Sequence, residues 1–100
     1  MYDMANVKKL KTLAAGAPAA MDAFTAFDKA AMTEGVVPKK YKELIALAVA
    51  LTTQCPYCIE IHGNNARKAG ATEAELAETA IVAAALRAGG ALTHATHTLT

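Results

Sequence analysis

The sequence predicts an all-α protein, a compact bundle of about five to six helices. Apolar residues recur at spacings of three and four along the chain, and glycines and prolines divide it into segments of helical length. No segment shows the alternation of apolar and polar residues that is typical of a half-buried strand. We expect the 100 residues to form a single domain, residues 1–100.

The first two predicted helices lie in the N-terminal third of the chain. The segment from about Met4 to Ala15 carries apolar residues at helical spacing and lysines on its other side, and it ends at Gly16. A second helix has Pro18 in its first turn, where proline is tolerated, and closes at Gly35. Its apolar stripe, which is typical of a face packed against a core, consists of Met21, Phe24, Phe27 and Ala31.

The third predicted helix opens at Pro38 and is the most apolar part of the chain. Between Glu43 and Leu51 it is apolar on nearly every face, so we expect it to be the central, buried helix. Pro56 disfavours the helical conformation at Cys55, and the chain should therefore break at this point.

The fourth predicted helix begins at this break and runs to Ala69, with Gly70 at the position just beyond its end. Thr72 and Glu75 form a capping box ahead of a fifth helix, which the Gly89-Gly90 pair interrupts. The last ten residues are expected to form a short sixth helix or a frayed tail.

Composition and charge restrict the expected partners. Ten basic and nine acidic residues give a net charge of +1, without the basic stripe that binds nucleic acid, so we expect no nucleic-acid partner. The longest apolar run, Leu44–Leu51, is far shorter than the roughly 20 residues that span a bilayer, so we expect no membrane partner. Asp3 stands where a secretory signal has basic residues, and we interpret the protein as leaderless and cytoplasmic.

Alanine supplies much of the 54% hydrophobic content. Because each alanine buries little area, a lone bundle of this size would be only marginally stable. We therefore expect a homo-oligomer whose subunits share a core.

The stretch Cys55-Pro-Tyr-Cys58-Ile-Glu-Ile-His62 concentrates the reactive side chains. Cysteines three positions apart at a helix N-terminus lie near enough for a disulfide, and the helix dipole favours their thiolates. His62 follows Cys58 by four positions, so imidazole and thiol share one helix face, within reach for proton transfer directly or through a water. In a reducing compartment such a pair is typical of redox, catalytic or metal-binding sites.

Glu43 is the fourth candidate residue. If the third and fourth helices fold back against each other, Glu43 and His62 lie at comparable depths, about 15 and 10 Å from the turn. A carboxylate in an apolar helix needs a partner to offset its desolvation, and contact with Glu43 would orient the imidazole and strengthen it as a base. Tyr57 is a possible auxiliary residue, either a hydrogen-bonding partner of the thiols or an apolar side chain that packs beside them.

Other interpretations of these residues stay open. The two cysteines and His62 supply three ligands for tetrahedral zinc, and His94 or His97 a fourth, in a non-enzymatic metal-binding oligomer. The two C-terminal histidines are otherwise surface or subunit-contact residues, and the main interpretation has no metal. The cysteines also suit a protein disulfide oxidoreductase that does not reduce peroxide. Cys-Pro-Tyr-Cys is a glutaredoxin signature too, but the strands and the cis-proline loop that a glutaredoxin needs are missing from the sequence.

Glu43, eleven intervening residues, Cys55-x-x-Cys58 and His62 resemble the core motif of the AhpD-like alkylhydroperoxidases, within the carboxymuconolactone decarboxylase family. The similarity is close over residues 38–69 and extends to the helical layout from about residue 18 to residue 88. It implies an all-α fold, homo-oligomers that are often trimers or hexamers, and an antioxidant peroxidase activity.

The resemblance also implies roles for these residues. Cys58 attacks the hydroperoxide, His62 and Glu43 relay protons, and Cys55 closes a redox-active disulfide, which an external dithiol, either a donor protein or a small molecule, then reduces without a bound cofactor. The helix dipole instead favours Cys55 as the thiol of lower pKa, whereas His62 favours Cys58. Some longer members carry histidine where Tyr57 stands here. The decarboxylase branch typically lacks the cysteine pair, which makes that activity the weaker alternative.

Overall fold

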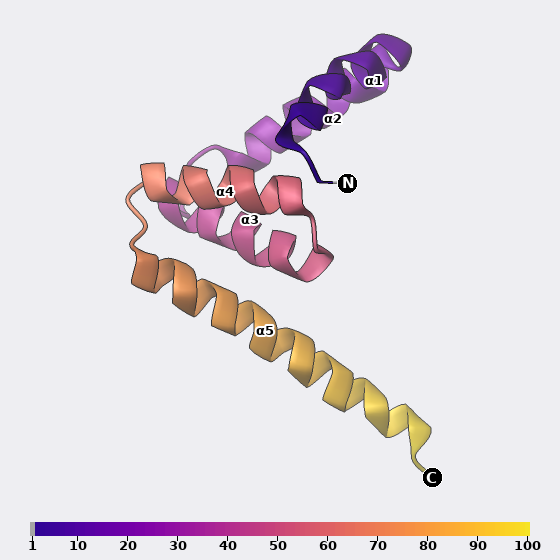
Figure 1. Cartoon of the computed structure of the whole chain (residues 1–100), viewed down its shortest axis with the longest axis vertical. Helices are drawn as coiled ribbons and strands as arrows, with labels where there is room; N and C mark the ends of the chain where they lie inside the picture. Colours follow the sequence, from indigo (N-terminus) through magenta and orange to yellow (C-terminus); the bar gives the residue numbers. More distant parts are fainter. Residues whose placement is uncertain (1) are drawn as a thin grey trace.

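The computed structural model describes residues 2–100, and all regular secondary structure in that range is helical (Figure 1). This confirms the predicted all-α class. In chain order the elements are the 3-10 helix η1 (Met4–Lys9), α1 (Leu10–Gly16), α2 (Pro18–Met32), α3 (Lys39–Thr53), α4 (Pro56–Lys68), α5 (Glu73–Ala95) and the 3-10 helix η2 (Thr96–Thr98). The first predicted helix is thus divided between η1 and α1, since a tighter 3-10 turn is common at a helix N-terminus.

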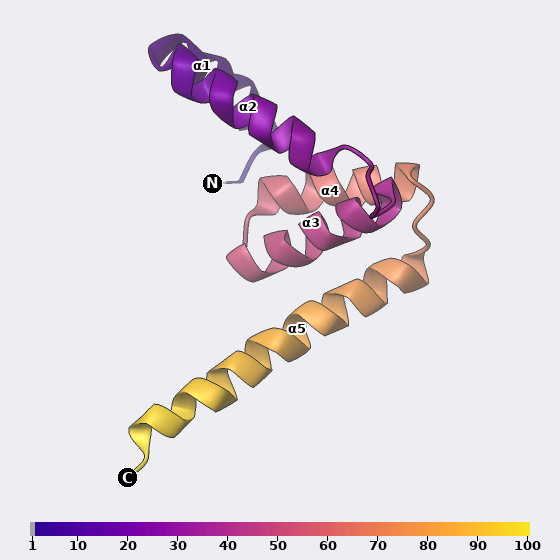
Figure 2. The same cartoon turned by 180° about the vertical axis from the view of Figure 1, so that it is seen from behind.

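The core forms where α3 packs against both α4 and α5, and α3 lies between these two helices in both views (Figure 2). Its buried apolar residues are Leu44, Leu47, Ala50, Ala66 and Ala83. The prediction that α3 is central is therefore confirmed.

The prediction that α3 is a buried helix is wrong for one of its faces within the single chain. Ile45 and Val49 are 56% and 55% exposed, because α4 and α5 cover only the side of α3 that carries Leu44 and Leu47.

A tight turn reverses the chain between α3 and α4. Gln54 adopts the left-handed conformation at φ 57° and ψ 43°, and the N–H of Cys55 donates to the carbonyl of Ala50 at 3.2 Å. Pro56 is the first residue of α4, where its missing N–H costs nothing. The predicted break at Pro56 is confirmed, and the turn lays α4 back along α3.

The end of α4 and the start of α5 follow the sequence prediction closely. Gly70 has φ 100°, and the N–H groups of Gly70 and Ala71 donate to the carbonyls of Arg67 and Ala66, the pattern of a Schellman motif. The predicted capping box of α5 is present, with Thr72 and Glu75 each bonding the other's backbone N–H.

The predicted interruption at Gly89-Gly90 is wrong, because α5 continues through both glycines to Ala95. Each glycine weakens a helix by about 1 kcal/mol relative to alanine without removing a hydrogen bond, and strong helix formers flank the pair. Residues Glu73–Thr98 are long and apolar enough to cross a membrane by length and composition alone. One such helix is weak support for a membrane span, because core helices of soluble proteins meet the same criteria.

Both ends of the chain project from this core. The α1–α2 pair extends to one side and the second half of α5 to another (Figure 1), and the radius of gyration is 16.5 Å, against about 13 Å for a typical domain of this length. Phe24 and Phe27 are 60% and 72% exposed, and Leu86 and Leu92 are 68% and 74% exposed. The apolar stripe of α2 therefore lies outside the core of its own chain, because α2 meets that core only at its C-terminal end.

Candidate active site

The two cysteines lie where the α3–α4 turn becomes α4. Cys55 is the N-cap residue of α4, and its Sγ accepts a hydrogen bond from the N–H of Cys58 at 3.3 Å. Both cysteines are free thiols and partly buried. The prediction of a dithiol at a helix N-terminus is confirmed.

The two thiols differ in their electrostatic environment. The pKa of Cys55 is lowered, mainly because the Cys58 thiol donates to its sulfur and also because the N–H groups of Cys58 and Tyr57 point at it. The pKa of Cys58 is raised, first by the neighbouring Cys55 sulfur and then by burial and by the charge of Cys55. Cys55 therefore holds the negative charge more readily, as the helix-dipole argument predicts.

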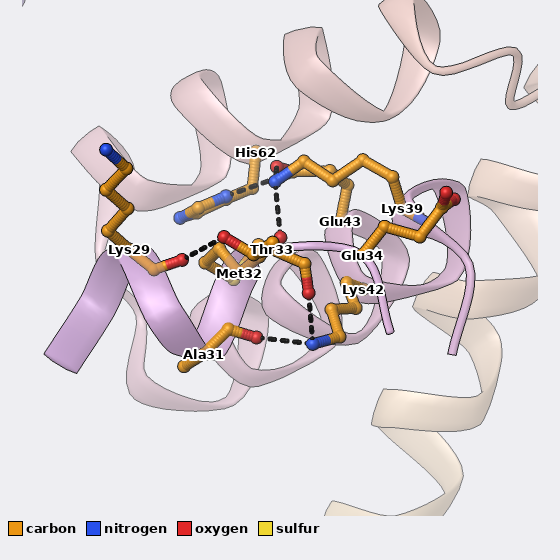
Figure 3. Close-up of polar contacts among 9 residues, drawn as sticks. All are labelled: Lys29, Ala31, Met32, Thr33, Glu34, Lys39, Lys42, Glu43 and His62. Atoms are coloured by element: carbon orange, nitrogen blue, oxygen red, sulfur yellow. Dashed lines mark hydrogen bonds and ion pairs between the residues drawn. The ribbon is translucent and has the colours of Figure 1, made fainter. Parts of the chain in front are cut away.

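Glu43 and His62 meet across the α3–α4 pair. Glu43 is 2% exposed, and its Oε2 lies 2.7 Å from Nδ1 of His62 (Figure 3). An ionised carboxylate can only accept hydrogen bonds, so Nδ1 carries the proton and Nε2 of a neutral imidazole is left as an acceptor. The predicted Glu–His contact is confirmed, and it leaves the imidazole in the tautomer that can take up a proton.

Lys39 completes this cluster, although the sequence analysis did not identify it. Its Nζ lies 3.0 Å from Oε1 of Glu43 and donates to the carbonyl of Met32 at 2.7 Å (Figure 3). Burial alone would raise the pKa of Glu43, but the hydrogen bonds from His62 and Lys39 outweigh it and bring the pKa below 4.5. The signal was available, because Lys39 precedes Glu43 by four positions on one helix face.

A second lysine fixes the position of α2 next to this cluster. Nζ of Lys42 donates to the carbonyls of Ala31 and Thr33 at 2.8 and 2.6 Å (Figure 3). Carbonyls at a helix C-terminus have no partner within the helix, and lysines satisfy them favourably. The first turn of α3 thus holds both the end of α2 and, through Lys39, the carboxylate of Glu43.

Not every candidate residue joins the site. Within residues 2–100, no hydrogen bond links His62 to either thiol, and no three potential ligands are grouped closely enough to hold a metal ion. His94 lies in the last turn of α5 and His97 in η2, with their ring centroids 5.6 Å apart. Tyr57 stands beside Cys58, but its hydroxyl oxygen accepts from Nδ2 of Asn6 at 3.1 Å, a contact between residues 51 positions apart that no local pattern predicts.

Fold and site define an all-α protein with a dithiol at a helix N-terminus and, nearby, a buried glutamate that contacts a partly buried histidine. The chain belongs to the carboxymuconolactone decarboxylase family, since residues 18–100 match the model of that family.

Two curated relatives are similar to this chain in sequence. The chain is 49% identical over 78 residues to an uncharacterized protein of the cox locus of Paracoccus denitrificans, which covers 78% of this chain and 70% of that protein. It is 41% identical over 73 residues to an uncharacterized protein of Cupriavidus necator, with 73% of this chain and 63% of that protein covered.

Two crystal structures share the fold. The apo form of a carboxymuconolactone decarboxylase family protein from Legionella pneumophila matches with a TM-score of 0.75 and 37% identity, over 90% of this chain and 80% of that chain. A protein from Methanobacterium thermoautotrophicum matches with a TM-score of 0.82 and 35% identity, over 88% of this chain and 99% of that chain.

Proposed function

We propose that this protein is a thiol-dependent peroxidase that reduces hydroperoxides through Cys58, Cys55, His62 and Glu43. The observation that carries the proposal is the 2.7 Å contact between the buried Glu43 and the partly buried His62, which lies one helical turn beyond a free dithiol. A buried carboxylate that orients an imidazole is the usual arrangement for a base that serves a nearby nucleophile. Membership of the carboxymuconolactone decarboxylase family agrees with an enzymatic role.

The reaction balances with these groups and one external dithiol. His62 first takes one proton from the dithiol at Nε2. The Cys58 thiolate then attacks the terminal oxygen of the hydroperoxide, the O–O bond breaks, and the departing alkoxide takes that proton from His62 to leave as an alcohol. Cys55 then attacks the sulfenic acid, so that a Cys55–Cys58 disulfide forms and water leaves. Two electrons from a small dithiol or a donor protein restore the thiols, and no bound cofactor takes part.

The lower pKa of Cys55 and the assignment of peroxide attack to Cys58 fit one mechanism. Cys58 lines a cavity of about 320 Å³, whereas Cys55 does not, so an oxidant in that cavity meets the Cys58 sulfur. The Cys58 thiol donates to the Cys55 sulfur, so the pair shares one proton. When this proton moves to Cys55, Cys58 becomes the thiolate. Cys55, with the lower pKa, is then the better leaving group when the reductant attacks.

Thiol titration tests this proposal directly. We expect one equivalent of cumene hydroperoxide to convert both thiols of the metal-free protein into a Cys55–Cys58 disulfide, which mass mapping locates and dithiothreitol reverses. His62→Gln should slow this conversion. Two unreacted thiols after exposure to the peroxide would contradict the proposal.

The lowered pKa of Cys55 favours a second candidate, a protein disulfide oxidoreductase. A thiolate at the N-cap of α4 is suited to attack on a protein disulfide. The same titration separates the two functions. An oxidoreductase would exchange rapidly with an oxidised protein and leave cumene hydroperoxide intact, and its rate would depend little on His62.

A further inference from the structure

The N-terminal residues lie outside the part of the chain that matches the family model, yet they contact the dithiol turn. The match begins at residue 18, whereas Asn6 bonds the hydroxyl of Tyr57 at 3.1 Å, and the rings of Tyr2 and Tyr57 meet edge to face at 5.2 Å. Tyr57 stands between the two cysteines. In both views the N-terminal segment lies beside the start of α4 (Figures 1 and 2).

This segment forms one wall of the cavity at Cys58. Asn6, Val7 and Leu10 line it from the N-terminal side, and the α4 residues that line it are Tyr57, Cys58 and Ile61. Almost all of the lining surface is apolar, and the volume of about 320 Å³ is at the small end of the range for ligand pockets.

We infer that the N-terminal wall, defined as Asn6, Val7 and Leu10, selects which oxidants reach Cys58 and favours hydroperoxides that carry a small apolar group over hydrogen peroxide. This inference rests on the proposed peroxidase function. An organic substituent gains free energy when it leaves water for an apolar cavity, whereas hydrogen peroxide has no apolar surface to bury. The hydrogen bond between Asn6 and Tyr57 holds the wall against α4.

Steady-state kinetics with dithiothreitol as the reductant test the selection. The measured quantity is kcat/KM for cumene hydroperoxide divided by that for hydrogen peroxide. In V7A/L10A we expect this ratio to fall about fivefold to tenfold, because a cavity that loses methyl groups discriminates less. The matched control is Leu13→Ala, which lies one turn further along α1 outside this cavity, and its ratio should not change. A ratio that stays the same in V7A/L10A, or falls equally in the control, would overturn the inference.

The hydrogen bond of Asn6 has its own test. Asn6→Ala should lower the same ratio, whereas Asn6→Asp should preserve it, because a carboxylate accepts a hydrogen bond from the Tyr57 hydroxyl. An Asp variant that behaves like the Ala variant would contradict the role given to this bond.

Alkylation of the thiols tests the wall without peroxidase turnover. Mass mapping gives the rates at which N-phenylmaleimide and iodoacetamide label Cys58, and Cys55, which does not line the cavity, is the internal control. The compared quantity is the labelling rate with the maleimide divided by the rate with iodoacetamide. In V7A/L10A this ratio should fall for Cys58 and stay constant for Cys55. If the protein shows this change in labelling but reduces no hydroperoxide, the proposed peroxidase function is refuted, whereas the selective role of the N-terminal wall is supported. If V7A/L10A raises the labelling rates of Cys58 by both reagents equally, the N-terminal wall only blocks access to Cys58 and does not select apolar groups. That result would overturn the inference.

Discussion

Glu43→Gln tests whether the site depends on a buried charge. The carboxylate of Glu43 is 2% exposed and bonds His62 and Lys39 at 2.7 and 3.0 Å. A glutamine amide has the same shape, but its NH₂ group must face one of these two donors. Loss of the bond to His62 costs about 1.5–3 kcal/mol, and Lys39, whose side chain is 44% exposed, adds at most about 1 kcal/mol because water screens it.

We therefore expect Glu43→Gln to lower the free energy of unfolding by about 2 kcal/mol at pH 7, which corresponds to a fall in Tm of about 8–16 °C for a domain of this size. The matched control is Glu73→Gln, which breaks the Arg67–Glu73 ion pair, whose side chains are 52% and 77% exposed. Because water screens this surface pair, the control should change the free energy of unfolding much less than Glu43→Gln does.

The effect of Glu43→Gln should depend on pH in a defined direction. The pKa of Glu43 in the folded protein is below 4.5, so its charge stabilises the fold fully above the ordinary pKa, and this contribution is lost as the pH falls through the folded pKa. Urea unfolding followed by circular dichroism, at one protein concentration, should show the full difference at pH 7 and a smaller one at pH 3. Equal stability at pH 7, or an undiminished difference at pH 3, would refute the reasoning.

Three further predictions concern other parts of the molecule. Gln54→Gly should raise the free energy of unfolding by about 1 kcal/mol in urea unfolding, because φ at this position is 57° and only glycine adopts it without strain. After exposure to a hydroperoxide, Cys55→Ser should accumulate a sulfenic acid that dimedone traps, whereas Cys58→Ser should form none; trapping in the latter would reverse the two roles. The exposed Leu86 and Leu92 predict self-association, which glutamate at both positions should weaken in sedimentation velocity; a 10.4 kDa monomer at micromolar concentration would contradict this.

The fold was largely predictable because its signals are local. Proline and glycine at the helix ends and the Thr72–Glu75 box act over a few residues, and the structure has these features where the sequence places them. The same reasoning failed at Gly89-Gly90, because the low helix propensity of two glycines is a small cost beside the stability that the twenty-one other residues give to one continuous helix. Burial was also misjudged for Ile45, because the apolar pattern of a helix shows which faces avoid water without showing what covers them.

The site was predictable only in part, for a related reason. Glu43 and His62 could be paired from the sequence because one tight turn fixes the relative depth of two antiparallel helices. Lys39 could have been added by the i, i+4 spacing to Glu43. The contact between Asn6 and Tyr57 could not, since it depends on how the N-terminal segment folds across α4, which no pattern over neighbouring residues specifies.

The two cavities at the site suit the two halves of the proposed chemistry. Cys58 lines the apolar cavity behind the N-terminal wall, where the polar side chains of the lining are Asn6 and Tyr57, which bond each other. Glu43 instead opens onto a second cavity of about 380 Å³, which Lys39, Asn65 and Lys68 also line. If Cys58 reduces hydroperoxides, we expect the proton for the leaving group to come through His62, which contacts Glu43 beside the polar cavity and follows Cys58 by one turn of α4. The oxidant and the proton then approach the reacting sulfur from different sides, so the apolar wall can exclude water without stopping proton transfer.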